Sequence, residues 1–153
     1  MAKRLQDHFG KLARKEGFPA RSVYKLEEID RRVRLFRPGQ RVLDLGAFPG
    51  SWTMYAADKV GASGSVLGLD IKEFEGALPP NAKIIHADIL KIDPAELGGE
   101  LSFDVVMSDM APSTTGQKKL DQIRSYELFS MAVATAERLL KPGGSFVGKL
   151  FQG

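Results

Sequence analysis

The sequence predicts an α/β fold, doubly wound around a mostly parallel β-sheet. Short apolar segments of strand length alternate with segments of helical periodicity, and turns that contain Gly or Pro separate them. Strands that alternate with helices are typical of βαβ units, whose strands run parallel. The chain has 153 residues, the usual size of one domain, and contains no internal repeat. We therefore expect residues 1–153 to form a single domain.

Each element has a local signal in the sequence. Strands are expected at residues 41–45, 65–70, 83–86, 103–108 and 145–150, and a helix at about 51–60. Ser22 can cap an earlier helix, whose apolar face would carry Val23, Leu26, Ile29 and Val33. A long helix precedes the last strand and has an apolar face made by Leu128, Met131, Ala132, Thr135 and Leu139. The turn at residues 141–144 ends that helix.

Composition excludes several classes of protein. Hydrophobic residues make up 43% of the chain and charged residues 27%, ordinary values for a soluble globular protein. No apolar run approaches the roughly 20 residues of a membrane helix, and the first residues lack the apolar stretch of a secretory signal. The chain has no cysteine, which excludes disulfides, thiol catalysis and Cys-ligated metals. Neither His8 nor His86 begins a cluster of metal ligands, so we expect no metal. From the lack of a membrane helix, of a secretory signal and of cysteine, we expect a cytoplasmic protein without a membrane contact.

Positive charge is concentrated at the start of the chain. Residues 1–41 hold 12 basic and 5 acidic side chains, whereas residues 42–153 hold 10 basic and 14 acidic ones. A basic segment on an acidic body is typical of a protein that binds a polyanion such as RNA, and the alternative is a solvated charged helix. We assign RNA binding to residues 1–40, as a helical segment. The expected phosphate contacts are Lys3, Arg4, Lys11, Arg14, Lys15, Arg21, Arg32 and Arg34.

Charged residues follow several of the expected strands at their carboxyl ends. Ligands of doubly wound sheets bind at this edge, near the point where the strand order reverses. The positions concerned are the loop after Leu45, then Asp70, Asp88, Asp109 and Lys149. A single carboxylate in such a place is commonly a local loop cap. Three of them behind a glycine loop indicate a binding site.

The loop after the first strand favours S-adenosylmethionine over a dinucleotide. In the dinucleotide fingerprint a second glycine follows the first by two residues and lets the backbone approach a pyrophosphate. Phe48 occupies that position here, and the spacing of Gly46 and Gly50 is typical of sites for S-adenosylmethionine, which carries no phosphate. Asp70 can accept hydrogen bonds from ribose hydroxyls, and Asp88 from the adenine amine. The alternative is a nucleotide-free α/β domain with ordinary turn glycines.

The loop after the fourth strand favours a hydroxyl as the methyl acceptor. Methyltransferases that act on base amines tend to place an aromatic residue after the proline of this loop, where Ser113 stands here. A ribose hydroxyl needs a base or a stabilised oxyanion, and a lysine acts as the base only when burial or a neighbouring cation lowers its pKa. Lys149 lies in the apolar fifth strand and Lys25 on a charged helix. Alone, each is better explained as a solvent-exposed lysine; with Asp109 they form a candidate catalytic set.

The chain resembles the FtsJ-like (RrmJ-type) ribosomal RNA 2′-O-ribose methyltransferases along essentially its whole length. The resemblance is carried by residues 5–9 (LQDHF), 21–29 (RSVYKLEEI), 42–52 (VLDLGAFPGSW), 106–112 (VMSDMAP) and 142–153 (PGGSFVGKLFQG). It implies a Rossmann-like methyltransferase fold with S-adenosylmethionine as cofactor. The usual substrate that it implies is a uridine ribose in the A-loop of large-subunit rRNA, within the assembled large ribosomal subunit.

The resemblance also implies roles for individual residues. The Lys-Asp-Lys-Glu tetrad of the family maps onto Lys25, Asp109 and Lys149 for its first three members. Lys149 is then the proton acceptor for the 2′-hydroxyl, Asp109 orients it beside the cofactor, and Lys25 supports the developing oxyanion. The cofactor positions of the family match Gly50, Trp52, Asp70, Asp88 and Asp109.

The sequence departs from the family pattern in the cofactor loop and at the end of the chain. Phe48 and Ser51 replace the commoner Ala and Gly, and the chain stops at Gly153, before the glutamate of the tetrad. We expect the full-length protein to be a monomer. A chain that ends with the fifth strand is expected to bind the cofactor, methylate poorly and self-associate through an open apolar edge made by Phe146, Val147, Leu150 and Phe151.

Two alternatives to an rRNA methyltransferase stay open from the sequence. One is a 2′-O-ribose methyltransferase that acts on tRNA or another RNA. The other is a non-catalytic RNA-binding module that retains the fold, which only the missing C-terminal segment favours. Methylation assays on isolated RNAs and on large subunits distinguish the first, and cofactor turnover distinguishes the second.

Overall fold

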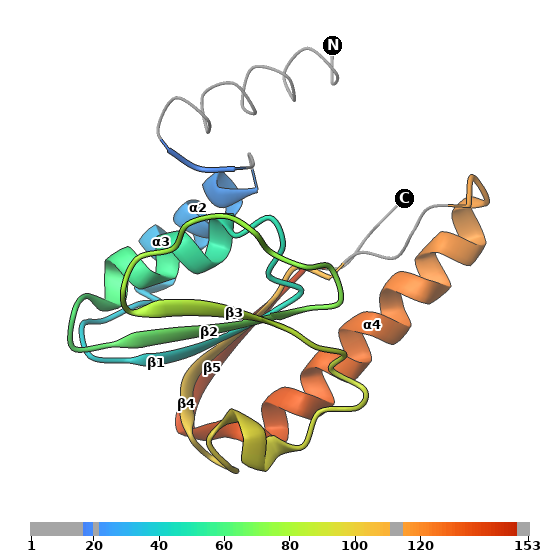
Figure 1. The fold of residues 1–153 in the computed structure, drawn as a ribbon. Helices are drawn as coiled ribbons and strands as arrows, with labels where there is room; N and C mark the ends of the chain where they lie inside the picture. Colours follow the sequence, from blue (N-terminus) through green and yellow to red (C-terminus); the bar gives the residue numbers. More distant parts are fainter. Residues whose placement is uncertain (1–16, 20–21, 111–114, 150–153) are drawn as a thin grey trace.

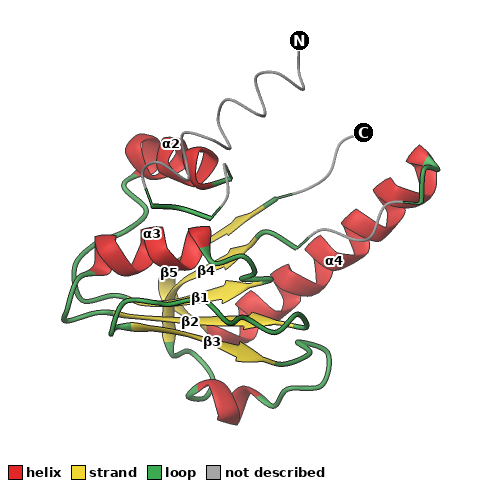
Figure 2. Ribbon diagram, turned by 45° about the horizontal axis from the view of Figure 1, so that its top comes forward, coloured by secondary structure: helices red, strands yellow, loops and turns green. Residues whose placement is uncertain are grey.

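The computed structural model describes residues 17–19, 22–110 and 115–149 of the chain (Figure 1). A five-stranded, all-parallel sheet lies at the centre, with helices on both of its faces (Figure 2). The strands are β1 (Arg41–Leu45), β2 (Ser65–Asp70), β3 (Ala82–His86), β4 (Phe103–Ser108) and β5 (Leu140–Gly148). The helices are α2 (Val23–Val33), α3 (Ser51–Val60), α4 (Lys118–Leu139) and the short 3₁₀ helix η1 (Pro94–Leu97). The predicted fold class is confirmed.

The strand order determines where a ligand can bind. It is β3-β2-β1-β4-β5, so the chain moves outward from β1 in one direction and then from β4 in the other. The order therefore reverses between β1 and β4, and the crevice at the carboxyl ends of these two strands is the expected binding place of a doubly wound sheet. The loops that begin after Leu45 and Ser108 both start there.

Alternating side chains of the strands build two separate cores. On one face, α2 and α3 cover a cluster that includes Val42, Val66, Val105 and Met107. On the other face, α4 and η1 cover a cluster that includes Leu43, Leu45, Leu67, Leu69 and Val106. Both faces of the sheet are thus buried, as expected for parallel strands that read as continuous apolar runs. Within the described residues, no helix combines the length and the apolar character needed to cross a lipid bilayer.

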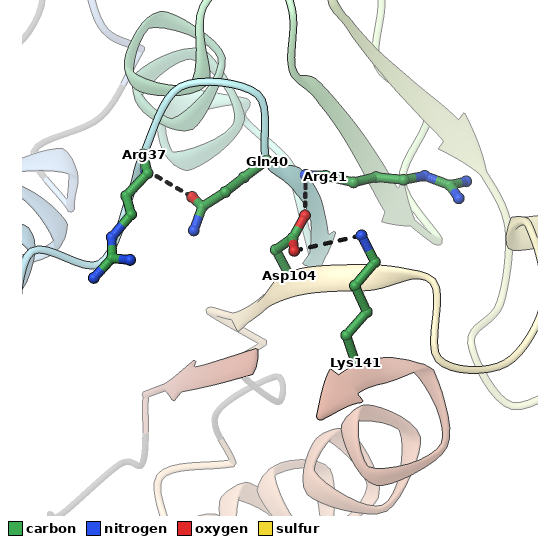
Figure 3. Close-up of polar contacts among 5 residues, drawn as sticks. All are labelled: Arg37, Gln40, Arg41, Asp104 and Lys141. Carbon is green, nitrogen blue, oxygen red and sulfur yellow. Dashed lines mark hydrogen bonds and ion pairs between the residues drawn. The ribbon is translucent and has the colours of Figure 1, made fainter. Parts of the chain in front are cut away.

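A cluster of charged side chains connects the strands at the amino-terminal edge of the sheet, opposite the carboxyl edge where ligands bind (Figure 3). Asp104 on β4 accepts a hydrogen bond from the backbone N–H of Arg41 at 2.7 Å and pairs with Lys141 Nζ at 3.4 Å. The guanidinium of Arg41 donates to the carbonyl of Leu97 at 2.8 Å and lies 4.6 Å from the centre of the Phe103 ring. The Asp104 carboxylate therefore connects the first residue of β1 and the beginning of β5 to β4.

Helix α2 differs from its prediction at both ends. Ser22 precedes the helix, but its side chain makes no capping hydrogen bond. Val23 and Leu26 are fully buried and Ile29 is partly buried, as predicted, whereas Val33 is 65% exposed. The reason is local: Arg34 adopts a left-handed conformation (φ 51°) and donates to the carbonyl of Asp30, which ends the helix and turns the chain away. The expected fourth apolar contact of Val33 is thus wrong.

The last part of the chain differs from its prediction in bounds and in burial. Strand β5 begins at Leu140, and the turn at residues 141–144 forms an irregularity in its pairing with β4. On α4, Ala132 and Leu139 are buried as predicted, whereas Leu128, Met131 and Thr135 are only half-buried. Phe146 and Val147 are half-buried on β5, and Leu150 and Phe151 lie outside the described residues.

Candidate active site

A cavity of about 390 Å³ lies at the carboxyl edge of the sheet, a volume within the usual range of small-molecule sites. It brings together four of the residues predicted from the sequence, Gly46, Asp70, Asp88 and Asp109. The rest of its lining is mostly apolar and consists of Phe48, Leu69, Ile71, Lys72, Ala87, Ile89, Leu90, Met110, Leu128 and Met131. Apolar walls with a few carboxylates fit a nucleoside that carries a cationic group, and so fit S-adenosylmethionine.

The glycine loop follows β1 and is bonded to the end of β2. The backbone N–H groups of Gly46 and Ala47 both donate to the carbonyl of Leu69, at 2.9 and 3.0 Å. Gly46 has a φ of 75°, and a Cβ there would lie 2.5 Å from Met110 Cγ. Gly50 has a φ of 102° and precedes the first residue of α3. Both positions require glycine, because other residues rarely adopt this conformation and Met110 leaves no room at the first.

Asp70 and Asp88 hold backbone loops at the edge of the cavity. Asp70 accepts hydrogen bonds from the backbone N–H of Phe48 at 2.9 Å and of Lys72 at 2.8 Å, and so joins the glycine loop to the chain after β2. Asp88 accepts from the N–H of Leu90 at 2.9 Å. The loop-cap interpretation therefore applies to both. A carboxylate has about four acceptor sites, so each can also accept from a ligand hydroxyl or amine.

Asp44 is a buried acid behind the glycine loop that the sequence analysis did not select. Its side chain is fully buried, and Oδ2 accepts a hydrogen bond from the Thr53 hydroxyl at 2.7 Å. Its pKa is raised to about 7, mainly by burial; the charges of Asp109 and Asp70 contribute to the increase, and the Thr53 hydrogen bond opposes it. Asp44 thus stiffens the join between β1 and α3 as a group that is neutral for much of the time near pH 7. Its position within a strand that reads as buried was the available signal.

Asp109 and Lys149 meet at the ends of the neighbouring strands β4 and β5. Lys149 Nζ lies 3.5 Å from Asp109 Oδ1, an ion pair longer than a short hydrogen bond. Burial raises the pKa of Asp109, and the charge of Lys149 and its hydrogen bond lower it. The side chain of Lys149 is 58% exposed, which agrees with a lysine that reaches solvent, and yet it is held at the cavity by Asp109.

Lys25 lies in the first turn of α2 and does not join that pair. Its side chain is 71% exposed and pairs with Glu28 of the same helix at 3.5 Å. Among the described residues, its ammonium makes no ion pair with Asp109 or with any other acid beyond Glu28. The structure therefore brings together two of the three predicted catalytic residues.

Trp52 and Gly50, predicted at the cofactor, are not among the residues that line the cavity. The Trp52 side chain is only 5% exposed, and its indole Nε1 donates to the carbonyl of Ser22 at 3.0 Å. Ser51 is buried, and Phe48 is partly exposed with Lys72 Nζ 5.3 Å from the centre of its ring. The two departures from the family pattern thus lie on opposite sides of the loop, one in the core and one at the cavity.

The predicted RNA contacts are only partly covered by the structure. Arg32 and Arg34 lie exposed at the end of α2, and Arg32 pairs with Glu28 at 3.2 Å. The other predicted phosphate contacts lie outside the described residues; they are Lys3, Arg4, Lys11, Arg14, Lys15 and Arg21. Pro112 and Ser113, in the loop after β4, also lie outside the described residues.

Sequence reasoning missed the apolar part of the lining. Phe48, Ile71 and Leu90 are large apolar side chains that stay exposed at the cavity. Ile71 directly follows Asp70, and Leu90 comes two residues after Asp88, so exposed apolar residues beside strand-end acids were the missed signal. Leu128 and Met131 lie on α4 and gave no such signal, because their periodicity is that of core residues. Met110, in the loop after β4, follows Asp109 directly.

Comparison with known proteins gives related sequences. The sequence profile of the FtsJ-like methyltransferases matches residues 18–153. A protein of Sorangium cellulosum named ribosomal RNA large subunit methyltransferase E is 59% identical over 145 residues, which cover 95% of this chain and 68% of that protein. A protein of the same name from Desulfatibacillum aliphaticivorans is 52% identical over 151 residues, which cover 97% of this chain and 72% of that protein.

Solved structures share the fold. The crystal structure of a ribosomal RNA methyltransferase from Plasmodium falciparum superposes with a TM-score of 0.77 at 25% sequence identity, over 88% of this chain and 79% of the other. An rRNA methylase from Clostridium thermocellum, with a TM-score of 0.56 and 20% identity, is similar in fold alone.

Proposed function

Because the chain belongs to the FtsJ-like methyltransferase family, it is an S-adenosylmethionine-dependent rRNA methyltransferase, and we propose which residues bind the cofactor and transfer the methyl group, and that the substrate is the assembled large subunit. The acceptor is the 2′-hydroxyl of a uridine in the A-loop of large-subunit rRNA. The observation that carries the residue assignment is the Asp109–Lys149 pair beside the cavity at the strand-order reversal. In this proposal, residues 1–153 are one methyltransferase domain and residues 1–40 are its RNA-binding segment.

The cavity residues would hold the cofactor by apolar contact and by acceptor groups. The glycine loop with Gly46 and Gly50 and the carboxylates of Asp70 and Asp88 face or border the space where a nucleoside fits. Asp109 and the backbone after Gly50, which includes Trp52, complete the proposed cofactor contacts. Bound S-adenosylmethionine supplies an activated methyl group on a cationic sulfur.

Three charged side chains of the chain act on the acceptor hydroxyl in this proposal. Lys149 Nζ first releases one proton to solvent and, as the neutral amine, accepts the proton of the 2′-hydroxyl; the Asp109 carboxylate, 3.5 Å away, orients the lysine and stabilises the ammonium that forms again. Lys25 supports the developing negative charge on the acceptor oxygen. The exposure of both lysines is consistent with an acceptor as large as an RNA strand.

Methylation of defined RNAs tests the proposal. The chain is incubated with labelled S-adenosylmethionine and, separately, undermethylated large subunits, isolated large-subunit rRNA and tRNA, and the methylated nucleotides are mapped by mass. We expect label on a ribose of the A-loop, mainly in the assembled subunit. Label mainly in tRNA or on a base would contradict the assignment. A large-subunit substrate also implies a cytoplasmic enzyme, and sedimentation of the full-length protein tests the expectation that it is a monomer.

A further inference from the structure

Trp52 is the single tryptophan of the chain and connects two parts of the site. It is the second residue of α3, which begins directly after the glycine loop. Its side chain is 5% exposed, and its indole N–H donates to the carbonyl of Ser22 at 3.0 Å, across 30 residues of sequence. The indole thus contacts the residue before α2 and is not part of the cavity lining.

The carbonyl that accepts this hydrogen bond also begins the turn that carries Lys25. The backbone N–H of Lys25 donates to the same Ser22 oxygen at 3.2 Å. Val23 and Leu26, in the same turn, are fully buried in the core cluster that contains Trp52. The position of this turn is therefore set by its contact with the start of α3.

The other end of α2 is fastened to α3 separately. The hydroxyl of Tyr55 donates to Asp30 Oδ2 at 2.8 Å, and Asp30 Oδ1 accepts from the backbone N–H of Phe36 at 3.0 Å. Trp52 and Tyr55 each donate one hydrogen bond from α3 to α2, at opposite ends of α2. Only the Trp52 bond lies at the turn of Lys25.

We infer that the indole N–H of Trp52 is a positioning group for Lys25, which couples the cofactor loop to the acceptor side of the site. The inference rests on the proposed role of Lys25. The ammonium of Lys25 is exposed, and its ion pair is with Glu28 on the same helix, so the placement of α2 determines where the ammonium lies. A tilt of the first turn moves Lys25 without altering the cavity.

Replacement of the indole N–H alone provides the test. Because the chain has one tryptophan, biosynthetic incorporation of β-(3-benzothienyl)alanine, in which sulfur replaces the N–H, changes only Trp52 and keeps the ring shape. We expect the single-turnover methylation rate at saturating cofactor and RNA to fall about tenfold, as for the loss of one hydrogen bond, and calorimetric cofactor affinity to stay within about twofold. Trp52→Phe serves as a second, genetically encoded variant.

Tyr55→Phe is the matched control, because it also removes one donor from α3 to α2. We expect it to lower the thermal midpoint about as much as the tryptophan change does, with a methylation rate within about twofold of the unchanged protein. Equal rate losses in the two variants would assign Trp52 a merely structural role and overturn the inference.

A double-mutant cycle shows whether Trp52 acts through Lys25. If it does, the benzothienyl replacement has no further effect on the rate in a Lys25→Ala background; independent, additive losses overturn the inference.

Hydrogen exchange at the Lys25 amide gives a readout that does not depend on methylation. We expect the replacement to accelerate exchange of this amide relative to amides of α4, and unchanged exchange overturns the inference. If the unchanged protein methylates no RNA while the amide responds as expected, the proposed function fails and the positioning contact stands.

Discussion

The two sides of the proposed site, one for the cofactor and one for the acceptor, are built differently. On the cofactor side, at the ends of β1, β2 and β3, Asp70 and Asp88 are held by backbone N–H groups at 2.8–2.9 Å. On the acceptor side, within the part of the chain that the structure describes, Lys149 is held by one ion pair at 3.5 Å, and Lys25 pairs only with Glu28 of its own helix. Short hydrogen bonds to backbone groups preorganise a pocket, whereas exposed ion pairs contribute little fixed geometry.

This difference predicts that the two sides of the site control different quantities, the cofactor affinity and the methylation rate. A pocket that backbone contacts preform can bind its ligand without reorganisation. Exposed lysines gain their final geometry when the large acceptor covers them, since catalytic hydrogen bonds tighten in the assembled complex. We therefore expect changes on the cofactor side to alter cofactor affinity, and changes on the acceptor side to alter the methylation rate.

Loss of Lys149 is the largest expected effect. Lys149→Ala should lower the single-turnover rate by about 10²–10⁴-fold, the usual contribution of general-base catalysis, with cofactor affinity unchanged in calorimetry. Lys141→Ala is the matched control, because Lys141 lies on β5, the strand that Lys149 directly follows, and pairs with Asp104 of β4 at 3.4 Å, at the opposite edge of the sheet (Figure 3). Equal rates for the two variants would remove Lys149 from the reaction.

Asp44 should make the free energy of unfolding of the protein depend on pH. Its folded-state pKa is raised from 3.8 to about 7, so the folded chain holds this proton more tightly and its contribution to stability is lost as pH rises from about 4 to about 7. Asp44→Asn keeps an acceptor for Thr53 and cannot ionise. The free energy of unfolding of the variant should therefore gain about 3 kcal/mol relative to the unchanged protein between pH 5 and pH 8. Urea titrations measure this; parallel pH curves would contradict it.

Asp70 should control affinity and leave the rate intact. Asp70→Ala removes the acceptor of the Phe48 and Lys72 N–H groups and the proposed acceptor for the ribose hydroxyls, and should weaken cofactor binding by about 1.5–3 kcal/mol. The rate at saturating cofactor should change much less. Asp93→Ala is a suitable control, because Asp93 accepts from the N–H of Ala95 in the same local pattern but at η1, outside the cavity lining. A rate loss at saturation without an affinity loss would place Asp70 on the acceptor side instead.

The smallest expected effect concerns single phosphate contacts on α2. Arg34→Ala should weaken RNA binding a few-fold and reduce the slope of log affinity against log salt by about 1, because one fewer phosphate is neutralised. Lys83→Ala, an exposed lysine on β3, should leave the slope unchanged. A slope that responds equally to both would place the RNA face elsewhere.

The sequence predicted the sheet and the strand-end acids for a physical reason. Buried parallel strands are continuous apolar runs, and a charged residue directly after such a run has to lie at the sheet edge. Asp70, Asp88 and Asp109 could therefore be assigned to one edge before their contacts were known, and the cavity confirms that they meet there. Only their backbone partners had to come from the structure.

The remaining features depend on contacts between distant segments. The partner of Trp52 lies 30 residues away, and nothing local in the sequence indicates that an indole bonds the carbonyl of Ser22. Val33 continues the apolar period of α2, but the left-handed Arg34 ends the helix beside it. Leu128 and Met131 have the spacing of core residues and line the cavity instead, because helical periodicity identifies a face but not what that face covers.

The pairing of β1 with β4 has a consequence for how the protein folds during synthesis. The bond from the N–H of Arg41 to Asp104 spans 63 residues, and β1 lies between β2 and β4 in the sheet. A nascent chain that has emerged only as far as β3 therefore carries β1 with one edge unpaired, which is a surface open to wrong partners. Such non-local pairing also slows folding, because a long loop must close first. The crevice for the cofactor cannot exist before β4 docks, so no folding intermediate can gain stability from the ligand until that step is complete.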